Sequence, residues 1–148
     1  MQATALTTGS VARDLGRVMK TVMTSTNRDF FSALDKAGLS FTQVKSLSLL
    51  TDADALSVSA IAEELVMSLA ATSRALDALV ESGHVTREED ERDRRSRLVS
   101  ITPQGRRTFE RLVAVRRAGI ERLLAELEPA ELESLAAALA PIAERLGR

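Results

Sequence analysis

The spacing of apolar residues changes at Gly83, and this change constrains the fold more than any other feature of the chain. Before Gly83, apolar residues recur every three or four positions, which is typical of amphipathic helices. Two short segments with strand character then follow, residues 84–87 and 98–101, separated by a highly charged stretch. The pattern predicts a mainly α chain with one β-hairpin, whose polar tip must face water or an anion.

Four helices are expected before the hairpin, because each apolar stripe lies between a capping residue and a helix-terminating residue. The expected helices are 11–37 ending at Gly38, 42–50 capped by Thr42, 60–65 capped by Ser59, and 69–82 capped by Ser68 and ended by Gly83. In the fourth helix one face is expected to carry Leu69, Leu76, Leu79 and Val80. The two short helices joined at Val66-Met67 fit a helix-turn-helix.

Two more helices are expected after the hairpin. The first begins at Thr102-Pro103, with the threonine as cap and the proline in the first turn, where its missing N–H costs nothing. The last begins at Pro129 and contains Pro141, which should kink or interrupt it. The length of 148 residues suits one domain with one core, and the sequence has no repeat or linker.

Charge is distributed unevenly, although the net charge is only −1. Residues 57–91 carry a net −6, whereas residues 92–122 carry a net +7, and every positive charge in that second segment is an arginine. The flat guanidinium group suits phosphate and guanine edges better than the lysine ammonium does. The local charge therefore favours an anionic partner more than the net charge suggests.

Composition excludes several classes of function. The chain has no cysteine, which removes disulfides, thiolate metal sites and thiol nucleophiles. No apolar run approaches the ~20 residues that span a bilayer, and residues 1–10 lack the pattern of a signal peptide, so cytoplasm is the expected location. We expect no cofactor, metal site or membrane partner.

The first turns of the fourth helix are the first candidate DNA contact. In a helix-turn-helix the second helix lies in the major groove, and its first residues reach base edges. Small and hydroxyl side chains there allow close approach, and Arg74 can form a bidentate pair with guanine. An ordinary amphipathic helix with a face of small residues would have the same composition, so this stretch alone does not decide between the two.

The hairpin tip favours DNA more strongly. Arg92, Arg94 and Arg95 could enter a narrow minor groove, where negative potential concentrates. Asp93 would repel phosphate, so its expected role is to orient a neighbouring arginine. A solvated loop of mixed charge is the alternative. The position of the tip directly after a helix-turn-helix favours a DNA-binding wing.

The stretch from Leu56 to Arg107 resembles the winged-helix core of the MarR (multiple antibiotic resistance regulator) family. The matching landmarks, in matching spacing, are Ser73-Arg74 with Asp77 and Leu79, then Ser82-Gly83-His84-Val85, Asp90-x-Arg92-Asp93-x-Arg95, and Thr102-Pro103-x-Gly105. The resemblance implies a single domain over 1–148, with a winged helix-turn-helix DNA-binding lobe at 42–101. It also implies a helical dimerisation region at 11–37 and 103–147.

The function implied by this resemblance is that of a homodimeric transcriptional regulator, a repressor on a pseudo-palindromic operator in double-stranded DNA. Many family members are released from DNA by a small aromatic or anionic effector. Transferred by position, the DNA contacts are Ser68, Ala70, Ala71, Thr72, Ser73, Arg74, Arg92, Arg94 and Arg95, with Asp93 as the orienting residue.

Two residues depart from the family pattern. Val66 occupies a turn position where glycine is common, and a β-branched residue argues against a left-handed backbone there. His84 replaces a bulky apolar residue; it is either a pH-sensitive group or, as is more usual, a packed or partly exposed strand histidine. The absence of cysteine also excludes the peroxide-sensing chemistry of one branch of the family.

Three alternatives remain. An enzyme is disfavoured, because the chain has a single histidine and lacks both a phosphate-binding glycine loop and an HExxH motif. The other two share the predicted fold: a dimeric interaction module without specific DNA binding, and a regulator that needs no ligand.

Overall fold

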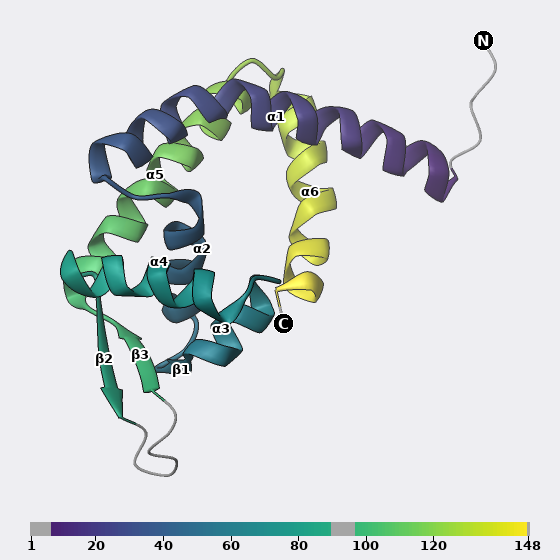
Figure 1. The fold of residues 1–148 in the computed structure, drawn as a ribbon. Helices are drawn as coiled ribbons and strands as arrows, with labels where there is room; N and C mark the ends of the chain where they lie inside the picture. The colour runs from purple at the N-terminus through teal and green to yellow at the C-terminus, as the bar shows by residue number, and fades with distance from the viewer. Residues whose placement is uncertain (1–6, 90–96, 148) are drawn as a thin grey trace. The chain divides into compact units, whose positions relative to one another are not determined.

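A computed structural model describes residues 7–89 and 97–147 of the chain. These residues form two compact units, and the long helices α1 and α5 contribute to both (Figure 1). We call Phe30–Val115 the winged unit, and the residues up to Asp29 together with those from Arg116 onward the helical unit.

The described residues form six helices and three short strands, which confirms the predicted mainly α winged-helix class. In chain order the elements are α1 (Thr8–Ala37), α2 (Phe41–Thr51), β1 (Leu56–Ser57), α3 (Val58–Glu64), α4 (Leu69–Glu81), β2 (Val85–Glu89), β3 (Arg97–Ile101), α5 (Pro103–Leu124) and α6 (Pro129–Leu146).

Two of the predicted caps are wrong by two residues. Helix α2 is capped by Ser40, whose hydroxyl accepts from the N–H of Gln43 while the Gln43 side chain accepts from the N–H of Ser40. Helix α3 is capped by Ser57 and not by Ser59. In both cases the earlier serine has extended backbone angles. Its side chain can therefore accept a hydrogen bond from an N–H in the first turn of the helix, which has no partner within the helix. Ser68 caps α4 as predicted.

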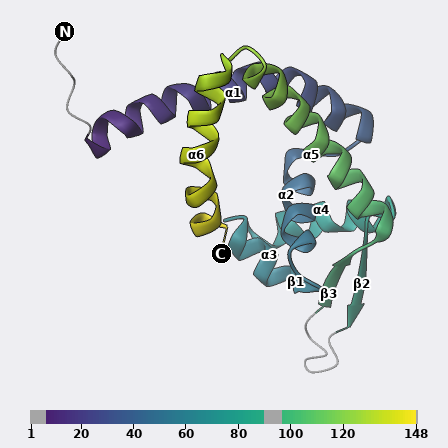
Figure 2. The same cartoon turned by 180° about the vertical axis from the view of Figure 1, so that it is seen from behind.

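The strands form an antiparallel sheet in the order β1-β3-β2, visible from both sides in Figures 1 and 2. Strand β1, which the sequence did not reveal, is only two residues long, too short for any alternating pattern. It pairs with β3 through Leu56 and Val99, while β2 pairs through Val85 and Ile101. Both valines are buried, so the sheet closes one side of the core.

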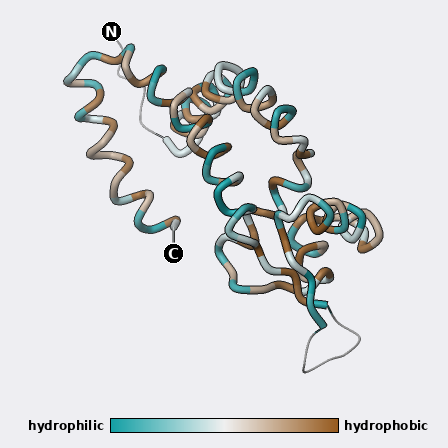
Figure 3. The backbone as a smooth tube through the Cα atoms, turned by 90° about the vertical axis from the view of Figure 1, so that its left-hand side faces the viewer, coloured by the Kyte–Doolittle hydropathy of each residue, from teal (hydrophilic) through white to brown (hydrophobic). Residues whose placement is uncertain are grey.

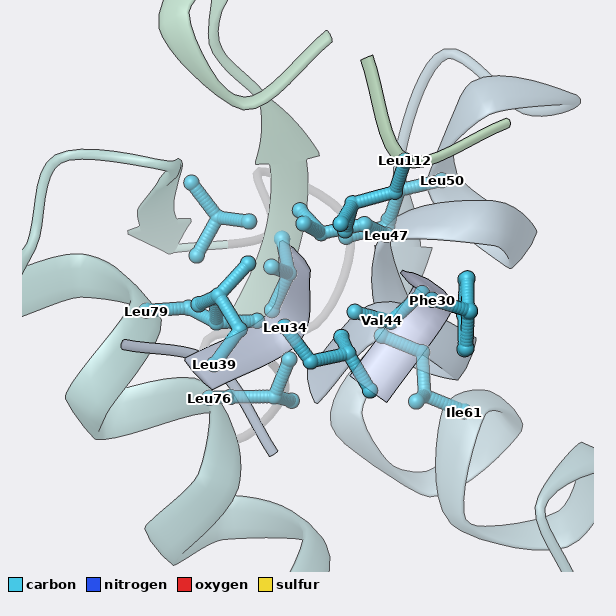
Figure 4. Close-up of a cluster of buried hydrophobic side chains, with 12 residues drawn as sticks. Phe30, Leu34, Leu39, Val44, Leu47, Leu50, Ile61, Leu76, Leu79 and Leu112 are labelled. Atoms are coloured by element: carbon cyan, nitrogen blue, oxygen red, sulfur yellow. The ribbon is translucent and has the colours of Figure 1, made fainter. Parts of the chain in front are cut away.

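One hydrophobic core lies inside the winged unit (Figure 4). Leu34 of α1, Leu47 of α2, Leu76 of α4 and Leu112 of α5 contribute to the same cluster. The fourth-helix stripe is only partly as predicted, because Leu76 and Leu79 are fully buried whereas Leu69 is 55% and Val80 39% exposed.

Close contact between α1 and α5 organises the helical unit. A Cβ on Gly119 would lie 2.6 Å from the Cγ2 of the buried Thr26, so glycine is required at this crossing. Nη1 of Arg116 donates to Oγ1 of Thr26 at 2.7 Å and to Oδ1 of Asn27 at 3.2 Å. These bonds hold the two helices together where no buried hydrophobic residue does so.

Helix α6 runs through Pro141, so of the two predicted effects, a kink or an interruption, the interruption is wrong. Because α6 has no buried residue, the carbonyl that loses its helical partner at the proline remains accessible to water. Apolar residues recur along this helix (Figure 3), and those that stay exposed are Leu132, Leu139, Ile142 and Leu146. None of the described helices is both long and apolar enough to cross a membrane.

Candidate nucleic-acid interface

Helices α3 and α4, joined by the turn at residues 65–68, form the predicted helix-turn-helix (Figure 1). Leu76 and Leu79 anchor α4 in the core, so its opposite face must point outward. This leaves the N-terminal half of α4 as the surface that could enter a groove of DNA.

The structure divides the predicted contact residues of α4 into three groups. Ser68, Ala70 and Arg74 are exposed, whereas Ala71 and Ser73 are half-buried. Leu69, which the sequence placed on one face with Leu76 and Leu79, is also exposed. The exposed group offers a guanidinium and a cluster of small or apolar groups at one end of the helix.

Thr72 forms the third group of predicted contact residues by itself, because its side chain is fully buried. It precedes Leu76 by one turn and therefore lies on the same inward face. Its Oγ1 has no hydrogen-bond partner among the described residues. The Thr72 side chain is thus placed inside the unit, away from the exposed face of α4.

The turn between α3 and α4 corrects a second expectation. Val66 has a φ of 53°, so its backbone is left-handed despite the β-branched side chain. The chain reverses direction tightly between two helix ends, and this geometry decides the backbone angle against the preference of the residue. The Val66 side chain is 92% exposed.

The predicted wing contacts Arg92, Asp93, Arg94 and Arg95 lie outside the described residues. The strands that flank them, β2 and β3, are paired from Val85 with Ile101 to Glu89 with Arg97. The two described strands therefore end opposite each other, at Glu89 and Arg97.

An ion pair connects the base of the hairpin to α4. Nη1 of Arg87 on β2 donates to Oδ1 of Asp77 on α4 at 2.6 Å. The Arg87 side chain is only 14% exposed, and its Nε and Nη2 have no partner among the described residues. No pattern in the sequence pointed to Arg87. Asp77 was noted only as a landmark, and the ten-residue separation hides a contact that exists only once β2 packs beside α4.

A second junction connects the sheet to α5. The N–H of Thr102 donates to the carbonyl of His84 at 3.0 Å, and the Thr102 hydroxyl donates to the Gly83 carbonyl at 2.7 Å. A Cβ on Gly105 would lie 2.1 Å from the His84 carbonyl oxygen, so only glycine permits this approach. Thr102 and Gly105 thus hold the start of α5 against the turn that follows α4.

His84 is packed at this junction, as one interpretation predicted, but it lies immediately before β2 and not in the strand. It is 7% exposed, and its Nδ1 lies 2.8 Å from the hydroxyl of Ser82. Burial lowers the pKa of His84 below the ordinary histidine value, because the charged ring would lose its hydration. The neutral ring is therefore the form that the fold favours.

The described part of the chain contains no cluster of three acidic, histidine or cysteine side chains that could hold a metal ion. Taken together, these contacts place the exposed end of α4, with Arg74, beside a paired hairpin that is held to α4 through Arg87 and Asp77.

Comparison with known proteins identifies the family. The family model named MarR matches residues 39–96. The chain is 34% identical over 126 residues to the uncharacterized HTH-type transcriptional regulator YfiV of Bacillus subtilis, covering 85% of this chain and 79% of that protein.

Solved structures agree with this assignment. A MarR-family transcriptional regulator from Silicibacter pomeroyi is 30% identical, with a TM-score of 0.58 and 86% of each chain covered. Wild-type MarR from E. coli in its apo form is 26% identical, with a TM-score of 0.68, 86% of this chain and 95% of that chain covered. The chain therefore belongs to the MarR family of transcriptional regulators.

Proposed function

We propose that this chain is a homodimeric repressor that binds a pseudo-palindromic operator. Membership in a family of transcriptional regulators places the chain outside the enzymes. The observation that carries the proposal is the exposed face at the N-terminal end of α4, which includes Ala70 and Arg74 and is anchored by the buried Leu76 and Leu79 on the opposite face. This is the arrangement that places side chains against base edges in the major groove.

Each DNA-binding element has a separate role in this proposal. Arg74 reads a guanine through a bidentate pair, which sets base preference at one position of each half-site. Arg92, Arg94 and Arg95 contact the minor groove and phosphates and set general affinity, with Asp93 orienting them. Ser68, Ala70, Ala71 and Ser73 contact the backbone and base edges, and Thr72 acts through packing only.

Exposed apolar residues of the helical unit support the homodimer. Side chains of α1 and α6 such as Leu15, Val18 and Leu139 are at least half exposed to solvent. A groove of about 810 Å³ lies between α1, α5 and α6 and is lined by Val18, Val22, Leu123, Leu127 and Leu135, among others. Apolar surface of this extent is typical of an interface between subunits.

Release by a small anionic ligand completes the proposal. A pocket of about 270 Å³ in the winged unit has Ala33, Leu112 and Val115 in its walls and Lys36 and Arg111 beside them. Neither cation forms an ion pair with another described residue. Apolar walls with two free cations suit a small aromatic carboxylate, and benzoate is the probe: it should weaken DNA binding by the wild type but not by Lys36→Ala with Arg111→Ala.

Selection of bound duplexes from a random DNA pool tests the central claim. Two-fold symmetry predicts an inverted repeat whose half-site centres lie about 10 base pairs apart. Inserting five base pairs between the half-sites moves one of them to the opposite face of the duplex, so binding should be lost. The control carries the same five base pairs outside the half-sites. Full-strength binding after the central insertion would exclude two-fold docking.

Two arginine variants then separate specificity from affinity. Arg74→Ala should relax the preference at one symmetric pair of positions, where a bidentate contact contributes about 1–3 kcal/mol. Arg94→Ala with Arg95→Ala should weaken binding to all sequences and lower the salt slope by about one for each lost phosphate contact. A wild-type salt slope in the double variant would remove the wing from the mechanism.

A further inference from the structure

Three helices of the winged unit end in the same hydrogen-bonded motif. At the end of α3, the N–H of Val66 donates to the Glu63 carbonyl at 3.0 Å, and the N–H of Met67 donates to the Ala62 carbonyl at 2.9 Å. This pair of bonds defines a Schellman motif, in which the first residue beyond the cap is left-handed.

Helices α1 and α4 end in the same way, with glycine at the left-handed position. The N–H groups of Gly38 and Leu39 donate to the carbonyls of α1 at 3.0 and 3.1 Å, and those of Gly83 and His84 donate to the carbonyls of α4 at 3.0 and 2.9 Å. Gly38 and Gly83 have φ angles of 65° and 74°. Glycine has no Cβ to clash there, which explains its use in two of the three motifs.

Val66 occupies the third left-handed position with a φ of 53°. A Cβ is unfavourable in this conformation, and a β-branched side chain makes it a genuine outlier. Packing of the Val66 side chain does not offset the strain, because that side chain is 92% exposed. The fold by itself would be better served by glycine or asparagine.

Strained residues of this kind concentrate at functional sites, and the position of Val66 indicates which one. It lies two residues before Ser68, the cap of α4, at the end of the helix that carries Arg74. Leu69, one residue beyond the cap, is also exposed. Two apolar side chains therefore lie at the end of the helix that our proposed function places in the major groove.

We infer that Val66 determines specificity by packing its methyl groups against the 5-methyl group of a thymine in each half-site. The thymine methyl is the apolar group that the major groove presents, whereas an apolar side chain against a phosphate would only remove hydration from the charge. The branched side chain has few rotamers, so it presents a rigid apolar surface. This inference rests on the proposed function, since it requires α4 to lie in the groove.

Replacing thymine by deoxyuridine removes only the methyl group and tests the contact directly. In the duplex selected from the random pool, each thymine of a half-site is replaced in turn, together with its symmetry mate. Wild-type protein should lose affinity about fifteenfold at one such pair, about fourfold for each buried methyl group. Val66→Asn, which tolerates the left-handed angle but has no methyl groups, should bind the thymine and deoxyuridine duplexes equally at that pair.

Val66→Ile is the matched control, because it keeps the apolar branched surface and should keep the sensitivity to deoxyuridine. Urea unfolding should show a higher midpoint for Val66→Asn and Val66→Gly than for the wild type, so weaker binding would not reflect a damaged fold. A lower midpoint for both would overturn the assignment of strain. Equal sensitivity of wild type and Val66→Asn at every thymine would overturn the contact alone, whereas a pool with no enriched duplex would overturn the proposed function and the contact together.

Discussion

The winged unit and the helical unit differ in where their apolar residues lie. Every buried hydrophobic residue of the described chain belongs to the winged unit, with Leu47, Leu50 and Leu76 completely inaccessible. In the helical unit, Leu15 of α1 is 55% and Leu139 of α6 is 50% exposed. Both units are rich in leucine, so composition does not separate them.

This difference shows that the two units depend on different contacts. The winged unit buries a cluster of apolar residues within one chain and has the caps and helix-terminating motifs of a self-contained fold. The helical unit is held by polar contacts between α1 and α5, such as Arg116 with Thr26, and leaves its apolar stripes uncovered. In the proposed homodimer a second copy of the chain covers them, so the stability of the helical unit should depend on protein concentration.

The largest effect is expected from placing charge on the exposed stripe of α6. Leu139→Glu with Ile142→Glu should raise the dissociation constant of the dimer about a hundredfold or more, because burying an unpaired carboxylate costs several kcal/mol. Analytical ultracentrifugation over a concentration series measures this change. Leu139→Met with Ile142→Met keeps the apolar surface and should remain dimeric. A charged variant that dimerises like the wild type would show that this stripe is not the interface.

Shortening a core side chain in the winged unit should lower the free energy of unfolding at every protein concentration, because this core lies within one chain. Leu76→Ala removes a fully buried side chain from α4 and should lower the free energy of unfolding by about 2–5 kcal/mol. Val80→Ala, on the same helix but 39% exposed, should lower it by less than about 1 kcal/mol. Urea unfolding checks both variants, and similar losses would mean that the core boundary along α4 is drawn incorrectly.

Breaking an ion pair should also cost more stability in the winged unit than in the helical unit. Asp77→Asn leaves Arg87 largely buried without a charged partner, and we expect a loss of about 1 kcal/mol in unfolding free energy, together with weaker DNA binding. Asp14→Asn breaks the exposed pair with Arg17 in α1 and should cost less than about 0.5 kcal/mol. If the two substitutions cost the same, Arg87 does not need Asp77 to hold the hairpin against α4.

The smallest expected effect is on the pH dependence of stability, through His84. Since burial lowers the pKa of His84 in the folded state, the unfolded chain binds the proton more readily. The contribution of His84 to stability is therefore fully present above about pH 6.5 and is lost as the pH falls toward the lowered pKa. Thermal melts from pH 7.5 to 5 should show a steeper decline for the wild type than for His84→Leu. Parallel declines would mean that His84 does not contribute to acid sensitivity.

Local chemistry in the sequence was sufficient to predict much of the winged unit. Ser68 as a cap and Gly83 as a left-handed terminus were confirmed, because each depends on a few neighbouring residues. The change of period at Gly83 predicted the hairpin, and the start of α5 at Thr102-Pro103 followed from helix-capping preferences. Arg74 and Ser68 were selected from their position on α4 and are exposed, as a contact would require.

Tertiary structure decided the features for which neighbours in sequence carry no signal. Strand β1 exists only because β3 pairs with it, and Arg87 meets Asp77 only because β2 packs beside α4. Thr72 looked like a contact residue from its hydroxyl, but packing turned it inward. Val66 adopts the backbone angle that its own side chain disfavours, because the tight connection between α3 and α4 outweighs a local preference of a few kcal/mol. Local preferences determine where helices begin and end, whereas burial and close packing determine which side chains remain available for contact.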